Sequence, residues 1–174
     1  MRNNFSLTNV YEKKSFNSKL VSQLLYGDIF KKIKTIKKWI KIKTTSDNYS
    51  GYIRNKKFLK NERSTHKISD SFANLYSKPS RKNKIKMKLY FGSKIKVIEK
   101  KGNFFKFDNF WINSKNLKKI SYVEKNYFNK IKFFLRTKYK WGGKSIKGID
   151  CSALIQLFLN FNNKYFSRDT KDQI

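Results

Sequence analysis

The 174-residue sequence contains one cysteine, one proline and one histidine. A single cysteine excludes an intramolecular disulfide and any cysteine-rich zinc site, so Cys151 is either a buried core residue or a reactive thiol. Residues 1–16 lack the apolar run of a secretory signal, and no run of about twenty apolar residues predicts a membrane span. We therefore expect a cytoplasmic protein with no membrane partner, and no ligand cluster predicts a metal or other cofactor.

Acidic residues are also scarce, because eleven Asp and Glu oppose 42 Lys and Arg, for a formal net charge of +31. Such an excess favours phosphate-bearing partners. Here it is nearly all lysine, spread from Lys13 to Lys171 and accompanied by Asn, Ile and Phe, a set that A/T-rich codons produce. Dedicated nucleic-acid binders concentrate charge on one face or element. We therefore expect a solvated basic surface and no specific nucleic-acid partner.

Two stretches of the sequence resemble each other at a fixed offset. The tripeptide at 25–27 aligns with that at 90–92, and apolar positions 30, 33, 39 and 42 align with 95, 98, 104 and 107. The first stretch then carries extra loop residues from Asp47 to Ser50. After them the register resumes, with Tyr52 aligned to Trp111 and position 58 aligned to 117. The sequence therefore contains an internal repeat with one change of loop length.

Within each copy apolar and polar residues alternate, as at 40–43 and 94–97, and turns follow at 48–51 and 100–103. This alternation predicts short antiparallel strands forming a small barrel. The order of turns, strands and aromatic residues resembles the bacterial SH3 domain. We predict an α+β protein with two SH3-like β-barrels at residues 18–62 and 70–120, connected by a polar bridge from Asn61 to Asp70.

From Ser121 onward the period of the pattern becomes helical. Ser121 and Glu124 form a capping-box sequence, and apolar positions 123, 127, 131, 134 and 135 share one face, which predicts a helix to about residue 136. Glycines at 142, 143 and 148 then interrupt the chain before a second helix. Asp150 suits the N-cap of this second helix, which places Cys151 in its first turn, where unpaired amides and the helix dipole favour a thiolate.

Three motifs follow in order: YKWGG at 139–143, GIDCSALIQ at 148–156 and RDTKDQ at 168–173. Together they resemble the signature of the NlpC/P60 cysteine peptidases, whose catalytic domain has a papain-like core. Ala153 and Ser167 replace the commoner Gly and Pro, both at positions that shape the backbone. The resemblance implies that residues 121–174 are the N-terminal part of that domain.

The family hydrolyses the bond between γ-D-glutamate and a diamino acid in peptidoglycan peptides. By resemblance, Cys151 is the nucleophile, and its backbone N–H and the Tyr139 hydroxyl hold the oxyanion. Asp150 and Ser152 match positions that contact substrate, although Asp150 is equally suited to a purely structural cap. Trp141 beside Gly142 has a packing role and a substrate role as equal alternatives.

The resemblance also implies that the first SH3-like domain closes the cleft and recognises the amine of an N-terminal L-alanine. Tyr49 and Tyr52 are candidates for this contact by location, with barrel core as the alternative. Arg168 could bind a substrate carboxylate, or pair with its neighbour Asp169.

The catalytic base of the family is a histidine on a strand after the nucleophile. The one histidine here, His66, lies in the predicted polar bridge, and no histidine follows Cys151. We therefore expect a C-terminally truncated domain that is inactive alone, with its apolar helix face exposed. Without an export signal, recycling of murein peptides in the cytoplasm is the favoured role.

Two other function classes remain open. The tandem SH3-like domains could bind cell-wall peptides without catalysis, with a degenerate segment after them. A basic RNA-binding protein would instead cluster lysines and aromatics on one strand face, whereas here lysine occupies nearly every exposed position. The sequence makes no prediction of oligomeric state.

Overall fold

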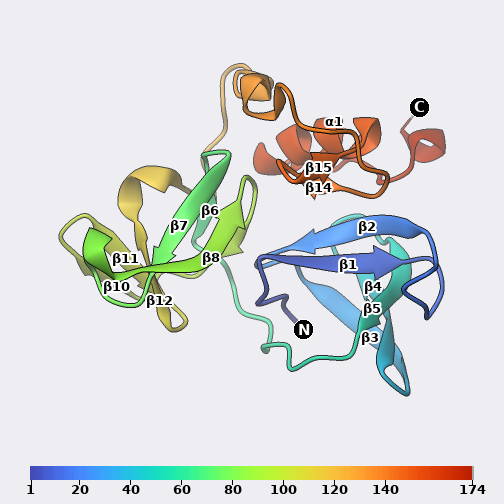
Figure 1. Cartoon of the computed structure of the whole chain (residues 1–174). Helices are drawn as coiled ribbons and strands as arrows, with labels where there is room; N and C mark the ends of the chain where they lie inside the picture. The colour runs from blue at the N-terminus through green and yellow to red at the C-terminus, as the bar shows by residue number, and fades with distance from the viewer. Residues whose placement is uncertain (174) are drawn as a thin grey trace.

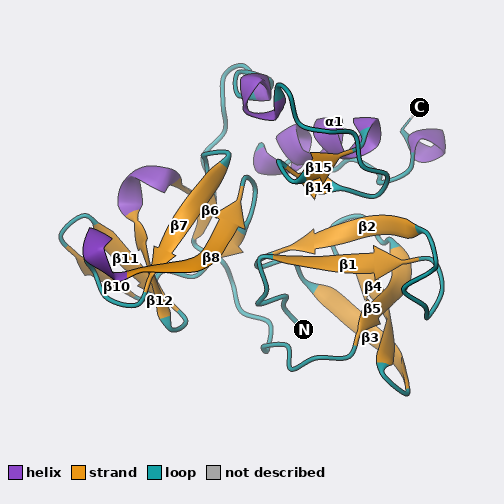
Figure 2. Cartoon of the chain, viewed as in Figure 1, coloured by secondary structure: helices purple, strands orange, loops and turns teal. Residues whose placement is uncertain are grey.

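A computed structural model describes residues 1–173 (Figure 1). Two units built of short strands lie side by side, and a third segment with the long helix covers both (Figures 1 and 2). We call them the first unit (residues 1–60), the second unit (65–120) and the helical segment (121–173). None of the helices in this range is long and apolar enough to cross a membrane.

The first unit is an antiparallel sheet with the strand order β2-β1-β5-β4-β3. Its apolar core comes from alternate positions of these strands, as the period-two pattern predicts. The expected start at residue 18 is wrong, because β1 pairs along its length with β2 and Arg2 bridges to Leu59. The strands are β1 (Leu7–Tyr11), β2 (Leu20–Leu25), β3 (Phe30–Ile36), β4 (Trp39–Thr44) and β5 (Ser50–Arg54).

The second unit has a five-stranded sheet, β10-β11-β12-β7-β8, and a three-stranded sheet, β13-β6-β9. Strand β6 lies in the stretch that we expected to be a linker, so the unit begins before residue 70. The elements are β6 (His66–Ile68), β7 (Phe72–Tyr76), η1 (Arg81–Asn83), β8 (Lys84–Tyr90), β9 (Lys94–Ile95), β10 (Glu99–Lys101), β11 (Phe104–Phe107), β12 (Phe110–Asn113), η2 (Ser114–Asn116) and β13 (Leu117–Lys119).

The positions that align in the sequence repeat have matching environments in the two units. Gly27 and Gly92 have φ angles of 85° and 82°, a region that favours glycine. Ile33 and Ile98 are both exposed, at 53% and 57%. Five other aligned pairs are buried in both units: Phe30 and Ile95, Trp39 and Phe104, Ile42 and Phe107, Ile53 and Ile112, Phe58 and Leu117. Tyr52 is half-buried, whereas its counterpart Trp111 is buried. Within residues 1–173, however, the hydrogen-bonded strand orders run from edge to edge without closing, so the predicted closed barrels are not observed.

The helical segment contains one long helix, α1, which begins at Cys151 as predicted. The predicted helix over 121–136 is wrong. Asn126 Oδ1 accepts the amide of Phe128 at 3.0 Å, and the amide of Glu124 donates to Asn162 Oδ1 at 2.6 Å in place of a capping box. The elements are η3 (Ile131–Phe134), β14 (Lys144–Ser145), β15 (Gly148–Ile149), α1 (Cys151–Phe161) and η4 (Thr170–Asp172).

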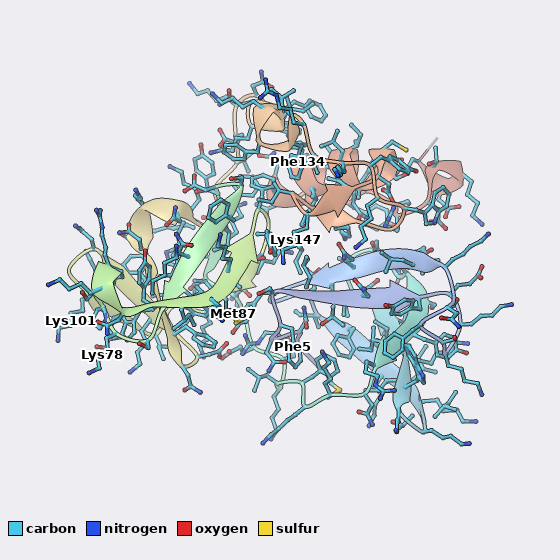
Figure 3. The ribbon with its side chains drawn as sticks, in the orientation of Figure 1. Phe5, Lys78, Met87, Lys101, Phe134 and Lys147 are labelled. Carbon is cyan, nitrogen blue, oxygen red and sulfur yellow. The ribbon has the colours of Figure 1, made fainter. Side chains whose placement is uncertain are left out.

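The apolar face of α1 is buried between the two units, contrary to our expectation of an exposed face. Leu157, Phe158 and Phe161 pack with Leu25 of the first unit and Phe91 of the second. Phe134 of η3 covers the same cluster, and Lys147 lies below it where the parts meet (Figure 3). The two units thus provide the partner surface that the helix requires, and this packing fixes the orientation of Cys151.

Candidate active site

Cys151 is the first residue of α1 and its side chain is exposed. Asp150 is the N-cap, as predicted, because its Oδ1 accepts a hydrogen bond of 2.8 Å from the amide of Ala153. At this first helical position the backbone N–H of Cys151 has no intrahelical acceptor. The thiol and a free amide donor are therefore presented together at the end of the helix.

The carboxylate of Asp150 has further partners, all within the protein. Arg168 donates from Nη2 to Oδ2 at 2.6 Å and from Nη1 to Oδ1 at 3.2 Å, and the amide of Gly142 donates to Oδ2 at 2.8 Å. The Arg168 and Asp150 side chains are 4% and 8% exposed. The sequence suggested Asp169 as the partner of Arg168, but Arg168 pairs with Asp150 instead. This geometry favours a structural role for the Asp150 side chain.

The paired glycines before Cys151 allow a close approach of backbones. Gly142 has a φ of 72°, and a Cβ at this position would lie 2.5 Å from the carbonyl oxygen of Leu20 in β2. A Cβ on Gly143 would lie 2.3 Å from the carbonyl oxygen of Gly148. The turn thus brings the segment against the first unit, and it leaves Tyr139 and Trp141 65% and 64% exposed at the rim of the site.

A cleft of about 330 Å³ opens beside Cys151, between α1, the first unit and residues 168–171. Six of the seven predicted site residues line it: Tyr49, Tyr139, Trp141, Asp150, Cys151 and Ser152. The seventh, Tyr52, lies in β5 opposite Lys41 and is not part of the cleft lining. The hydroxyl of Ser152 is 2.8 Å from that of Thr170, which connects α1 to the last turn of the site.

Tyr49 reaches the cleft from the extra loop of the first unit. Burial raises the pKa of its hydroxyl to about 12, and the nearby carboxylate of Asp169 acts in the same direction. The phenol therefore stays protonated at neutral pH and can donate a hydrogen bond into the cleft.

Four charged residues of the cleft were missed from the sequence. Glu12 and Lys19 flank the hairpin between β1 and β2, and Asp169 and Lys171 belong to the RDTKDQ motif. Glu12 and Lys19 escaped notice because they precede or begin the stretch expected to fold. Acidic residues are scarce in this lysine-rich chain, and that scarcity is the signal that could have identified Glu12 as a candidate site residue.

His66 lies in β6, in the second unit, and is not among the residues that line the cleft. Its ring contacts Phe105 at 5.4 Å between centroids, and its Nδ1 is 2.9 Å from the Thr65 hydroxyl. Burial, together with Lys119, lowers the pKa of the imidazole. Nor does any group of three His, Cys, Asp or Glu side chains within 1–173 come together as metal ligands.

Comparison with family models matches residues 6–60 to the bacterial SH3 domain and residues 136–174 to the NlpC/P60 family. A crystal structure of an NlpC/P60 family protein from Bacillus cereus superimposes with a TM-score of 0.85 at 15% sequence identity, covering 99% of this chain and 75% of that chain. The NlpC2 and NlpC1 structures from Trichomonas vaginalis are 18% and 17% identical, with TM-scores of 0.33. Each covers 99% of this chain, against 68% and 65% of the two proteins. No curated protein matches the sequence.

Proposed function

We propose that the protein is a cysteine peptidase that acts on cell-wall peptides. The support is that one segment matches the bacterial SH3 domain and another matches the NlpC/P60 family, whose members are generally cysteine peptidases. The bond cleaved is the amide between the γ-carboxyl of D-glutamate and a diamino acid. The observation that supports this proposal best is the exposed Cys151 thiol at the start of α1, inside a cleft lined by the other residues of the motif.

The chemistry follows from the position of this thiol. The sulfur, having given its proton to a base, attacks the amide carbonyl carbon, and the C–N bond breaks as the base protonates the leaving amine. Water then hydrolyses the thioester and releases the glutamyl product. The Cys151 amide and the Tyr139 hydroxyl would stabilise the oxyanion, at ~3 to 4 kcal/mol for each such donor.

The charges of the cleft suit a short zwitterionic peptide. Lys19 and Lys171 can pair with the free carboxylates of a γ-D-glutamyl peptide, and Glu12 can pair with an ammonium group. Tyr49 adds a hydroxyl donor from the first unit. A cleft of about 330 Å³ holds a short peptide rather than a polymer, which supports soluble murein peptides, met in the cytoplasm during recycling, as the substrate.

We further propose that residues 1–174 bind this peptide without turning it over. The described residues around Cys151 include no imidazole, and His66 is engaged in the second unit. The thiol then lacks the group that accepts its proton and returns it to the amine. A non-catalytic binding module is the alternative, and the second unit would be its second SH3-like domain, for which the matching burial of the repeated positions is the support.

The test uses the tripeptide L-Ala-γ-D-Glu-diaminopimelate with the chain and with its Cys151→Ala variant. Calorimetry should show binding to both proteins, and mass spectrometry should show release of diaminopimelate only when free imidazole is added to the protein that retains Cys151. Tyr139→Phe removes the hydroxyl proposed to stabilise the oxyanion. Tyr165→Phe is its matched control, because both tyrosines are about equally exposed and only Tyr139 lines the cleft. Absence of peptide binding refutes the proposal, and binding without imidazole-dependent cleavage supports the binding module instead.

A further inference from the structure

The loop from Thr44 to Ser50 distinguishes the first unit from the second. Nine residues, 43–51, separate Ile42 from Tyr52, whereas three residues, 108–110, separate the aligned Phe107 from Trp111. The extra residues do not project into solvent. They contact the helical segment, and the reason is the carboxylate of Asp47.

Asp47 connects this loop to α1 and also closes the loop on itself. Gln156, a fully buried residue of α1, donates from Nε2 to Asp47 Oδ2 at 2.8 Å. The other oxygen, Oδ1, accepts from the Thr44 hydroxyl and lies 3.4 Å from the amide of Tyr49. Gln156 Nε2 also donates to the carbonyl of Phe166 at 2.9 Å, so the same amide joins the loop to the stretch that leads to the cleft.

The backbone of Tyr49 is held by the same contacts. Its amide donates to the Thr44 hydroxyl at 2.8 Å, and its carbonyl accepts the Thr44 amide at 2.9 Å. Asn48 between them has a φ of 56°, so the loop turns sharply before Tyr49. The Tyr49 side chain consequently enters the cleft beside Asp169.

We propose that Asp47 is a positioning residue, which ties the extra loop to α1 through Gln156 and thereby holds Tyr49 as a wall of the Cys151 cleft. Asp47 would hold Tyr49 in this place whatever the cleft binds, and only the description of the cleft as a peptide site rests on the proposed function. Asp47 touches no reacting atom in this arrangement. Its effect on the cleft passes through Tyr49.

The electrostatic surroundings agree with this role. Burial by itself raises the pKa of Asp47, but Lys144 and the hydrogen bonds from Thr44, Gln156 and Tyr49 outweigh it, so the pKa is lowered. The carboxylate is therefore ionised at neutral pH, when its bonds to the donors are strongest.

The second unit offers a matched control at the corresponding turn. There Asp108 faces the first unit, accepting from Arg2 at 2.9 and 3.0 Å and from the Tyr26 hydroxyl. Asp108→Ala therefore removes the same kind of group from the equivalent turn of the other unit, at a place that does not line the cleft.

Because Cys151 is the only cysteine, alkylation of the chain reports the width of the cleft without any need for catalysis. We would measure the rate with iodoacetamide and with a bulky maleimide, and take the ratio of bulky to small. In Tyr49→Ala the ratio should rise about threefold or more, the scale of contacts that couple directly. Asp47→Ala should raise it similarly, Asp47→Asn less, and Asp108→Ala not at all.

The decisive measurement is the double variant. If Asp47 acts through Tyr49, the ratio in Asp47→Ala/Tyr49→Ala equals that in Tyr49→Ala, whereas independent effects multiply. Multiplying effects, an unchanged ratio in Asp47→Ala, or an equal rise in Asp108→Ala would overturn the proposal. Circular dichroism of each variant checks folding, and Asp47→Asn keeps the test valid if the alanine variant unfolds. Tripeptide binding to the unaltered chain is measured separately. If that binding is absent, the proposed function fails, but the alkylation ratios still test the role of Asp47.

Discussion

Replacing Asp150 tests the central contact of the site. Asp150→Ala removes the side-chain cap of α1, at about 1 kcal/mol, and leaves the buried Arg168 without its carboxylate, at about 3 to 5 kcal/mol. The free energy of unfolding should therefore fall by roughly 4 to 6 kcal/mol, a large share of the about 5 to 15 kcal/mol of an ordinary protein. Asp150→Asn keeps a good cap and should lose mainly the ion-pair part.

The assay is urea unfolding followed by circular dichroism, with Arg168→Met and the double variant Asp150→Asn/Arg168→Met completing a cycle. Since each single change leaves one buried partner unmatched, the double variant should be more stable than the sum of the single effects allows, by at least about 1 kcal/mol. Additive losses, or a loss below about 1 kcal/mol in Asp150→Ala, would show that Asp150 does not hold the site together.

Two further predictions concern backbone approach and pH. Gly142→Ala should destabilise the chain by about 1 to 3 kcal/mol in thermal unfolding, because its Cβ would meet the Leu20 carbonyl oxygen, whereas Gly102→Ala, with a φ of 53° and open space around it, should cost less. Lys67 is buried, and this burial is the main reason why its pKa is lowered to about 8. Between about pH 8 and 10.5 the unfolded chain then binds more protons than the folded one, so stability should gain up to about 1.4 kcal/mol per pH unit from this group. Lys67→Arg stays protonated, and urea titrations that show the same pH slope for both proteins would contradict the assignment.

The local geometry of the site was predictable where it depends on neighbours in the sequence. The Asp150 cap and the Cys151 position rest on contacts within one helical turn, so the pattern of residues carries them directly. The internal repeat was equally visible, because burial of a strand face repeats every second residue. The first prediction uses a local capping preference, and the second uses the period-two alternation that a strand backbone imposes.

Pairings between distant segments were not predictable. Arg168 was matched with its neighbour Asp169, while its actual partner lies eighteen residues earlier on another element. The apolar pattern over 121–136 indicated a helix, but the Asn162 side chain takes up the Glu124 amide from afar. Strands β1 and β6 were missed because a single short strand has no signal of its own until its partners are known.

The contacts made by the helical segment also bear on how the chain can be divided. Its buried polar groups are matched by the first unit: Lys144 donates its amide to Gln23 at 2.9 Å, and Arg168 donates to Ser22 at 3.2 Å. Residues 121–173 expressed alone would carry these groups into solvent without partners, together with the apolar face of α1. The three parts are therefore not independent, interchangeable domains. An SH3 domain from another protein could replace the first unit only if the loops and edge strand of the first unit were transplanted onto it as well.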